Sequence, residues 1–391
     1  MDELIDKYVA KLHDQGLSSP QETLLGVLDA EIAWNRDDPA ADQLEQVFAA
    51  IGVNSLLLAR PKEPYRSIIE YLAREPGTAI RPHDSETRTF LHDIPVVRSL
   101  TAEAIIDGLR SRKCLIVPGS GIIAAGSVSP EQTFIHFSSV CFATFTTFFA
   151  QLLSEAGSGR IDSTAWSVYE LAVSHLPQPP SAAEAATAVK RGPFCTEEEV
   201  VSAMDQAGKA VVRLGLVDSF FGNISYRLDR TIYISQTSSS LDELIGCIDP
   251  CPMDGSSSAA VTASSELSAH REILAHRDFQ AVVHGHPKFA VIMSMHCQTP
   301  DCQARGECHR RCPRHREVGS IPIVSGEVGT GPFGLYRTVP PAVLDRGGAI
   351  VYGHGVFTAG RDDFLDGLTR LVEIENFCRS EYFRYLMALQ G

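Results

Sequence analysis

A stretch rich in proline and small residues divides this chain near its middle. Residues 174–194 read SHLPQPPSAAEAATAVKRGPF and interrupt the periodic apolar pattern on both sides. The chain has 391 residues, 44% of them hydrophobic, which exceeds one typical domain and is enough to bury large cores. We therefore predict two domains, residues 1–175 and 195–391, joined by a linker at residues 176–194.

The net charge of the chain indicates which kinds of binding partner it can have. A formal net charge of -14 disfavours a broad surface for nucleic acid or an anionic membrane and favours a small-molecule substrate. The N-terminus lacks the basic and apolar regions of a secretory signal. The most apolar run, residues 134–153, contains a histidine, hydroxyl residues and a glutamine, which suits a buried helix better than a bilayer span. We expect a cytoplasmic protein without nucleic-acid or membrane partners.

The second half alternates helical and strand-like segments. It opens with an amphipathic helix, in which Thr196 and Glu199 have the spacing of a capping box. Strands are expected at residues 223–228, 231–236 and 280–286, with helices near 265–276, after residue 287 and over 364–389. This irregular alternation predicts an α/β or α+β fold.

Two histidines end one of the expected strands. His284 and His286 are two residues apart, so the pleat directs both imidazoles to the same side. Two converging imidazoles are a usual start for a zinc site that keeps an open position for substrate. His354 lies between two glycines, which allow close backbone approach, and is the natural third ligand. Taken alone, such a histidine pair is more often a surface or core feature.

The first half resembles a degenerate copy of the second half. Residues 54–69 align with 280–293 when Pro61 is set against Pro287, and residues 92–97 and 113–126 resemble 319–324 and 349–360. In this alignment the three histidines become Leu58, Arg60 and Ser120, so the first half would lack the metal ligands. The alternative is that two α/β segments share strand-turn-helix patterning by chance.

Four motifs in the second half occur in an order that resembles a known family. They are GNIS at residues 222–225, SSE at 264–266 followed by His270, AVVHGHP at 281–287, and GHG at 353–355. This series is similar to the class II aldolase/adducin superfamily. The resemblance implies a three-layer αβα sandwich with a central sheet, preceded here by a degenerate related domain. It also implies ring-shaped tetramers with active sites between neighbouring subunits.

The resemblance also assigns roles to the candidate site residues. It implies that His284, His286 and His354 bind a divalent metal, usually zinc, and that Glu266 is the acid/base or a fourth ligand. In the aldolases the metal acts as a Lewis acid that stabilises an enediolate during carbon–carbon cleavage. Positions that match the family's phosphate donors are Asn223, Thr237, Ser264 and Ser265.

Two departures from the aldolase pattern leave the anchoring group open. Phe220 stands where the aldolase has a threonine, and Ser238 stands where it has a glycine. Ser238 can still supply donors in another geometry, so it remains a candidate substrate-binding residue. A turn asparagine without a ligand role is the alternative reading of Asn223.

A short polar segment concentrates cysteines beside the histidine strand. Cys297, Cys302, Cys308 and Cys312 have a CX4CX5CX3C spacing that matches no common zinc-finger or ferredoxin pattern. We predict a second metal site there, a structural zinc or less favourably an iron–sulfur cluster, with reduced or redox-active thiols as the alternative. Ten cysteines in such a chain favour thiols or metal ligands over a disulfide framework.

Other residues have weaker functional readings. Glu327 is a candidate second carboxylate but reads better as a turn residue, and the arginines of the cysteine segment read better as a solvated face. In the aldolases a tail tyrosine of a neighbouring subunit donates a proton, and Tyr382 and Tyr385 are the available tail tyrosines here. Both are equally readable as packing residues of an amphipathic helix.

The leading functional hypothesis is a metal-dependent carbon–carbon lyase. It would act on a small hydroxylated carbonyl compound, with a sugar phosphate as one candidate. Epimerases, dehydratases and decarboxylases share the scaffold, and a non-catalytic adducin-like assembly module is the second class of hypothesis. A homodimer of two-domain chains that resembles the family's tetramer is the expected assembly.

Overall fold

The structure is a computed structural model that divides into two compact units, Met1–Pro177 and Gln178–Gly391. It describes residues 1–74, 79–218, 220–256, 258–297, 299 and 302–389. The segment that the sequence predicts as a linker contains helix α8 (Ala182–Ala188), which has a capping box and contacts two helices of the second unit. Residues from Gln178 onwards therefore pack with the second unit.

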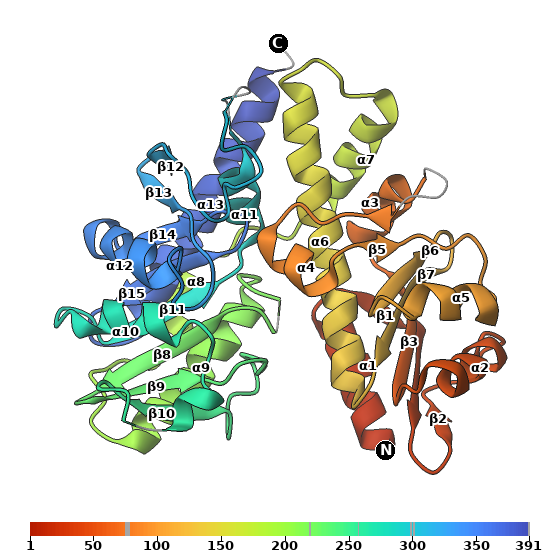
Figure 1. Ribbon diagram of the computed structural model, residues 1–391, viewed down its shortest axis with the longest axis horizontal. Coiled ribbons are helices and arrows are strands. Elements are labelled where there is room, and N and C mark those ends of the chain that lie inside the picture. Colours follow the sequence, from red (N-terminus) through yellow and green to blue (C-terminus); the bar gives the residue numbers. More distant parts are fainter. Residues whose placement is uncertain (75–78, 219, 257, 298, 300–301, 390–391) are drawn as a thin grey trace. The chain divides into compact units, whose positions relative to one another are not determined.

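The first unit is built on a five-stranded antiparallel sheet with the order β2-β1-β3-β7-β6 (Figure 1). A short pair, β4-β5, lies beyond it, and Val96 after β5 bridges in parallel to Ile116 of β6. Its elements are α1 (Asp2–Asp14), β1 (Ser18–Leu28), β2 (Ile32–Trp34), α2 (Ala41–Ile51), β3 (Ser55–Pro61), α3 (Tyr65–Leu72), β4 (Ala79–Ile80), α4 (Ser85–Leu91), β5 (Ile94–Pro95), α5 (Ala102–Leu109), β6 (Cys114–Val117), β7 (Gly121–Gly126), α6 (Pro130–Ala156) and α7 (Ser163–Ser174).

Helix α6 is the most apolar element of the first unit. By length and composition it could cross a membrane, but 89% of its most apolar window is buried inside the structure. It contacts β3 and β7 as well as α1 and α3. Hydrophobic side chains on all sides of α6 therefore find protein partners, as expected for a core helix.

The second unit is built on an eight-stranded sheet with the order β10-β9-β8-β11-β15-β14-β13-β12. The pairing is antiparallel except between β13 and β14. Besides α8, its elements are α9 (Glu197–Arg213), β8 (Asn223–Leu228), β9 (Thr231–Ser235), β10 (Ile248–Pro252), η1 (Ser258–Val261), α10 (Leu267–Ala275), β11 (Ala281–Gly285), α11 (Lys288–Met295), β12 (Arg316–Val318), β13 (Ile321–Val324), α12 (Leu335–Arg346), β14 (Gly348–Val351), β15 (Val356–Gly360) and α13 (Leu365–Ala388).

Helices cover both faces of this sheet (Figure 1). On one face, Val282 of β11 and Phe357 of β15 join an apolar core with α10 and α12. On the other face, Val283 lies against Gly367 of α13. Successive residues of β11 thus pack on opposite layers, as the pleat requires. The predicted mixed α/β class and the flanked central sheet are confirmed, as is the capping box of Thr196 and Glu199 at the start of α9.

Candidate metal centre

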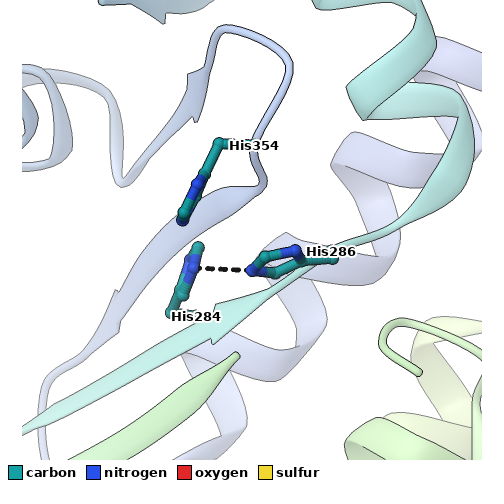
Figure 2. Close-up of side chains that lie close together, drawn as sticks. All are labelled: His284, His286 and His354. Atoms are coloured by element: carbon teal, nitrogen blue, oxygen red, sulfur yellow. Dashed lines mark hydrogen bonds between the residues drawn. The ribbon is translucent and has the colours of Figure 1, made fainter. Parts of the chain in front are cut away.

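Strand β11 places the first two histidines. All five residues of β11 are buried, and His284 pairs with Asn223 of β8 on one side and with Phe357 of β15 on the other. His286 follows immediately after the strand and is also buried. The side chains of His284 and His286 converge, with their Nε2 atoms 3.0 Å apart, as their spacing predicts (Figure 2).

The turn between β14 and β15 brings the third histidine to the same place. Gly353 has φ 59°, in the left-handed region that favours glycine, and its N–H donates to Ser294 Oγ at 2.8 Å. A Cβ on Gly355 would lie 2.8 Å from His284 Cε1 and 2.8 Å from His286 Cδ2. The two glycines that flank His354 are therefore required by backbone conformation and by space.

The three imidazoles form a compact group. Their ligand nitrogens all lie within 4.8 Å of one another, and each ring is buried (Figure 2). Ring centroids are 5.2 Å apart for His284 and His354 and 4.8 Å apart for His286 and His354. Within the described part of the chain, no other group of three or more histidine, cysteine or acidic side chains lies close enough together to hold a metal ion.

Hydrogen bonding and ring packing orient two of these imidazoles. His284 Nδ1 lies 3.0 Å from the carbonyl oxygen of Val356, which can only accept, so Nδ1 carries the proton and donates it. The Nε2 of His284 is then left as the ligand atom, the arrangement typical of metal-binding histidines. The ring of His284 stacks on Phe357, and the ring of His286 stacks on Phe221.

Glu266 lies against the histidine group at the start of α10. Its Oε1 is 3.0 Å from His354 Nε2, and its Oε2 is 3.2 Å from His284 Nε2. The Nδ2 of Asn223 donates to Oε2 at 2.7 Å. Residues from β8, β11, the β14–β15 turn and the N-terminus of α10 thus meet at one buried point.

The surroundings keep Glu266 ionised. Burial by itself would raise the pKa of its carboxyl group, but the positive charge of His284 and the hydrogen bonds from His354 and Asn223 outweigh burial and lower the pKa well below its usual value. A positive charge beside the carboxylate is needed for this balance, and either a protonated imidazole or a bound cation can supply it.

The histidine chemistry fits a divalent metal. Burial, followed by the charges of His284 and His354, lowers the pKa of His286 well below its ordinary value, which favours the neutral imidazole that binds metals. The Nε2 atoms of His284 and His286 lie 3.0 Å apart, and His286 Nδ1 is buried without a hydrogen-bond partner in the described structure. Three imidazoles beside a carboxylate are a donor set that zinc commonly takes. The residues present therefore fit the metal that the sequence predicts.

The predicted substrate-binding residues divide into a buried and an exposed set. Asn223 and Ser264 are buried, and Ser264 Oγ accepts the backbone N–H of Glu266 at 3.3 Å. Thr237, Ser238 and Ser265 are exposed. Ser238 has φ 59°, so this position keeps the left-handed backbone that suits the glycine of the aldolase pattern.

Among the described residues, no three of the cysteines in the 297–312 segment lie close enough together to form a ligand group. Cys297 is exposed, the other three are half-buried, and none belongs to a ligand group in the part of the chain that the structure describes. The segment is instead held by its backbone, because Ser325 Oγ donates to the Cys308 carbonyl at 2.6 Å and Gly326 N donates to the His309 carbonyl at 3.0 Å. The predicted second site at Cys297, Cys302, Cys308 and Cys312, whether zinc or iron–sulfur, stays a prediction, because residues 298 and 300–301 of the same segment lie outside the described residues.

The weaker candidates also have structural roles. Glu327 forms an ion pair with Arg310 at 3.0 Å. Tyr382 is completely buried and packs edge-on against Phe289, so it is a core residue of α13. The half-buried Tyr385 packs against the ring of His296.

Two supporting contacts were not predicted from the sequence, although Ser225 and His270 themselves belong to the motif series. Both carboxylate oxygens of Glu375 accept backbone hydrogen bonds at the start of α11, from Phe289 at 3.0 Å and from Ala290 at 2.9 Å. His270, one turn after Glu266, is fully buried with Nδ1 2.7 Å from Ser225 Oγ. These contacts join elements distant in sequence, so no local pattern reports them.

Comparisons with known proteins find similarity in the part of the chain that contains the histidine group. Residues 202–382 match the family model of the Class II Aldolase and Adducin N-terminal domain, which is somewhat less than half of the chain. No curated protein matches the chain.

Similar solved structures each cover about half of this chain. They include an L-fuculose-1-phosphate aldolase from Thermus thermophilus, with 20% identity, 49% of this chain and 98% of that chain covered, and a TM-score of 0.39. YgbL from Klebsiella pneumoniae, described as a candidate aldolase/epimerase/decarboxylase, has 21% identity, coverage of 49% and 91%, and a TM-score of 0.37. A sugar-phosphate aldolase from Thermotoga maritima has 17% identity, coverage of 49% and 96%, and a TM-score of 0.36.

Proposed function

Because residues 202–382 belong to the class II aldolase/adducin superfamily, we propose that the second unit is a divalent-metal-dependent carbon–carbon lyase. Its substrate class is a small hydroxylated carbonyl compound, and a sugar phosphate is the first candidate. The observation that carries this proposal is the convergence of three buried imidazoles with the ionised carboxylate of Glu266.

Each group at the site has a distinct part in the proposed reaction. A divalent ion bound by His284, His286 and His354 would supply a Lewis acid for the substrate's carbonyl oxygen. The carboxylate of Glu266 accepts and returns a proton at its Oε atoms, which is general acid–base catalysis. Asn223 holds Oε2 in place through its 2.7 Å hydrogen bond.

Two aromatic rings support the histidines. Phe357 stacks on His284 with centroids 3.9 Å apart, and Phe221 stacks on His286 at 5.3 Å. These rings limit the water that reaches the imidazoles, which strengthens electrostatic interactions at the site. The exposed hydroxyl groups of Thr237, Ser238 and Ser265 are the proposed contacts for a phosphate or another polar group of the substrate.

Metal content tests the proposal at its base. We expect protein purified without added metal to carry a divalent ion, most simply zinc, at one equivalent per chain. A His284→Ala/His286→Ala variant should lose that equivalent in elemental analysis while remaining folded by circular dichroism. A wild-type protein that is metal-free after gentle purification would favour the non-catalytic, adducin-like alternative instead.

A product assay separates the lyase from its closest alternatives. Phosphorylated and free ketoses are incubated with the metal-loaded protein, and the products are identified by mass spectrometry. Two carbonyl fragments are expected from a lyase. A product of unchanged mass would indicate an epimerase, loss of water a dehydratase, and loss of carbon dioxide from an acidic substrate a decarboxylase.

The predicted assembly and location belong to the same proposal. We propose a homodimer of two-unit chains in the cytoplasm, acting in carbohydrate metabolism. Light scattering of the full-length protein should give the mass of two chains. A monomer or a tetramer of full-length chains would contradict the dimer.

A further inference from the structure

The two units have the same strand order. In the first unit the order is β2-β1-β3-β7-β6, extended by the parallel bridge from Val96 to Ile116. In the second unit the order β9-β8-β11-β15-β14 is extended by the parallel pair β14-β13. In both sheets the first strand of the unit lies between the second strand and the strand that corresponds to β3 or β11, and the remaining strands follow in the same sequence. Strand β10 of the second unit is an addition to this shared order.

The strand registers are also the same. Residues that the sequence alignment sets against one another occupy the same position in both ladders. The aligned pairs are Leu58 with Ile123 and His284 with Phe357, and Val96 with Ile116 and Ile323 with Ile350. On the other side of the same strands, Leu58 pairs with Leu24 and His284 pairs with Asn223, which makes Leu24 and Asn223 equivalent positions. A slip of one residue would exchange the two faces of the strand, so agreement across several strands is a demanding condition.

Glycines recur where backbones approach each other. A Cβ on Gly121 would lie closer than 3.0 Å to the carbonyl oxygen of Ala59, and a Cβ on Gly355 would also lie closer than 3.0 Å to the carbonyl oxygen of Gly285. Ala59 and Gly285 are equivalent positions in β3 and β11. The first unit therefore keeps the backbone contact that, in the second unit, places His354 next to the histidine strand.

Several backbone hydrogen bonds outside the strand ladders repeat as well. The N–H of Asn54 donates to Gly126 at 2.9 Å, and the equivalent N–H of Gln280 donates to Gly360 at 3.0 Å. Two further equivalent pairs are Leu28 to Asn54 at 2.8 Å with Arg227 to Gln280 at 2.7 Å, and Ser120 to Val117 at 2.9 Å with His354 to Val351 at 3.1 Å. General strand-turn-helix patterning does not require these individual bonds.

We infer that the first unit is a second copy of the fold of the second unit, in which the backbone of the metal site is retained and its ligands are absent. The first unit thus contains a latent metal site. This inference rests on the proposed metal binding by the second unit.

The equivalent positions in the first unit are all unsuited to a metal. Leu58, Arg60 and Ser120 replace the three histidines, and Leu24 replaces Asn223. At the N-cap of α2 stands Ala40, where Glu266 stands at the N-cap of α10. Leu58, Leu24 and Ala40 instead pack with the apolar core around α2 and α5.

Restoring the ligands tests the inference directly. Leu58→His, Arg60→His and Ser120→His are introduced together into a chain that also carries His284→Ala/His286→Ala. All three new positions are half-buried and leave room for exchange. Cobalt(II) is the probe, because its visible absorption reports nitrogen coordination in the assembled protein.

We expect the restored chain to bind one equivalent of cobalt with a visible band that the His284→Ala/His286→Ala parent lacks. A matched control keeps Leu58 and carries only Arg60→His and Ser120→His, and it should lose that band. A restored chain that keeps the parent's thermal transition but takes up no cobalt overturns the inference.

A second readout covers the case in which the triple substitution prevents folding. The chain with only Arg60→His and Ser120→His is then titrated with copper(II), and electron paramagnetic resonance should show coupling to two imidazole nitrogens. Coupling to one nitrogen or none would overturn the inference. Wild-type protein run in parallel keeps the two proposals apart, since failure of the proposed function appears as a metal-free wild type.

Discussion

Glu266 is the residue on which the proposed chemistry depends most. It is buried, accepts a hydrogen bond from Asn223, and lies within 3.2 Å of two imidazole nitrogens. Its position is set by the N-terminus of α10 and by the Ser264 hydroxyl, which accepts its backbone N–H. A carboxylate held by contacts on several sides can exchange a proton without first reorganising.

The Glu266→Gln variant should separate catalysis from metal binding. The amide keeps the size of the side chain but cannot accept a proton, so we expect kcat to fall about 100- to 10,000-fold, the usual contribution of a general acid–base group. Metal content, measured by elemental analysis, should stay near one equivalent because the three histidines remain. A variant with wild-type kcat would remove Glu266 from the proton transfer.

His136 of α6 should make the unfolding free energy of the first unit decrease at acidic pH. Its Nδ1 lies 2.7 Å from the Ala125 carbonyl, and burial lowers the pKa of this histidine to about 4. The unfolded chain, with a pKa near 6.5, takes up a proton that the folded chain does not. Stability from this residue is therefore complete above pH 6.5 and is lost as pH falls towards 4.

The matched variant is His136→Gln, which can still donate to the Ala125 carbonyl but does not titrate. The decrease in unfolding free energy between pH 6.5 and pH 4 should be smaller in this variant, by up to roughly 3 kcal/mol. Urea unfolding at several pH values measures the unfolding free energy of both proteins. Parallel pH curves for the two proteins would show that His136 does not contribute.

At the scale of elements, helix α13 fixes the helix that follows the histidine strand. Glu375 reaches from α13 to the first turn of α11 and accepts the N–H groups of Phe289 and Ala290. The N-terminal N–H groups of a helix have no partner within the helix, so a carboxylate there replaces a cap. This contact helps to hold the backbone that connects β11 to α11, where His286 lies.

Glu375→Gln should destabilise the protein by about 1–3 kcal/mol, because one of the two buried N–H groups then faces an amide donor. Glu373→Gln is a control on the same helix, since Glu373 is 53% exposed and pairs with Arg370. It should change stability by less than about 0.5 kcal/mol. Thermal and urea unfolding compare the two variants, and equal effects would exclude a capping role for Glu375.

At the scale of the whole molecule, each unit has a hydrophobic core of its own, so a bound metal should stabilise one unit and not the other. One core lies between the first sheet and α2 and α5, and another lies between the second sheet and α10 and α12. A ligand that binds the folded form of one unit stabilises that unit by mass action. A metal bound at the histidines should therefore act on the second unit.

Chelation should reveal this division in calorimetry. We expect two thermal transitions, of which removal of the metal lowers the one assigned to the second unit and leaves the other in place. The His284→Ala/His286→Ala variant should resemble the chelated wild type and respond no further to chelator. A single transition that shifts as a whole would show that the units unfold as one.

Local patterns in the sequence determined much of this protein. The pairing of His284 with His286 on one side of a strand follows from the pleat, and the glycines beside His354 follow from backbone conformation and space. The alternation of helical and strand-like segments predicted the mixed α/β class, and the motif series predicted the family resemblance of the second half, which the match over residues 202–382 confirms. Each motif consists of residues a few positions apart, and the order of the motifs along the chain is part of the sequence, so the sequence alone contains this information.

Contacts between distant segments were decided by the tertiary structure. It brings Glu266 and Asn223 to the histidines and places Glu375 at the start of α11. The common register of the two sheets is likewise visible only once strands have paired. Spacing along a chain fixes side-chain direction within one element, whereas packing between elements decides which side chains meet.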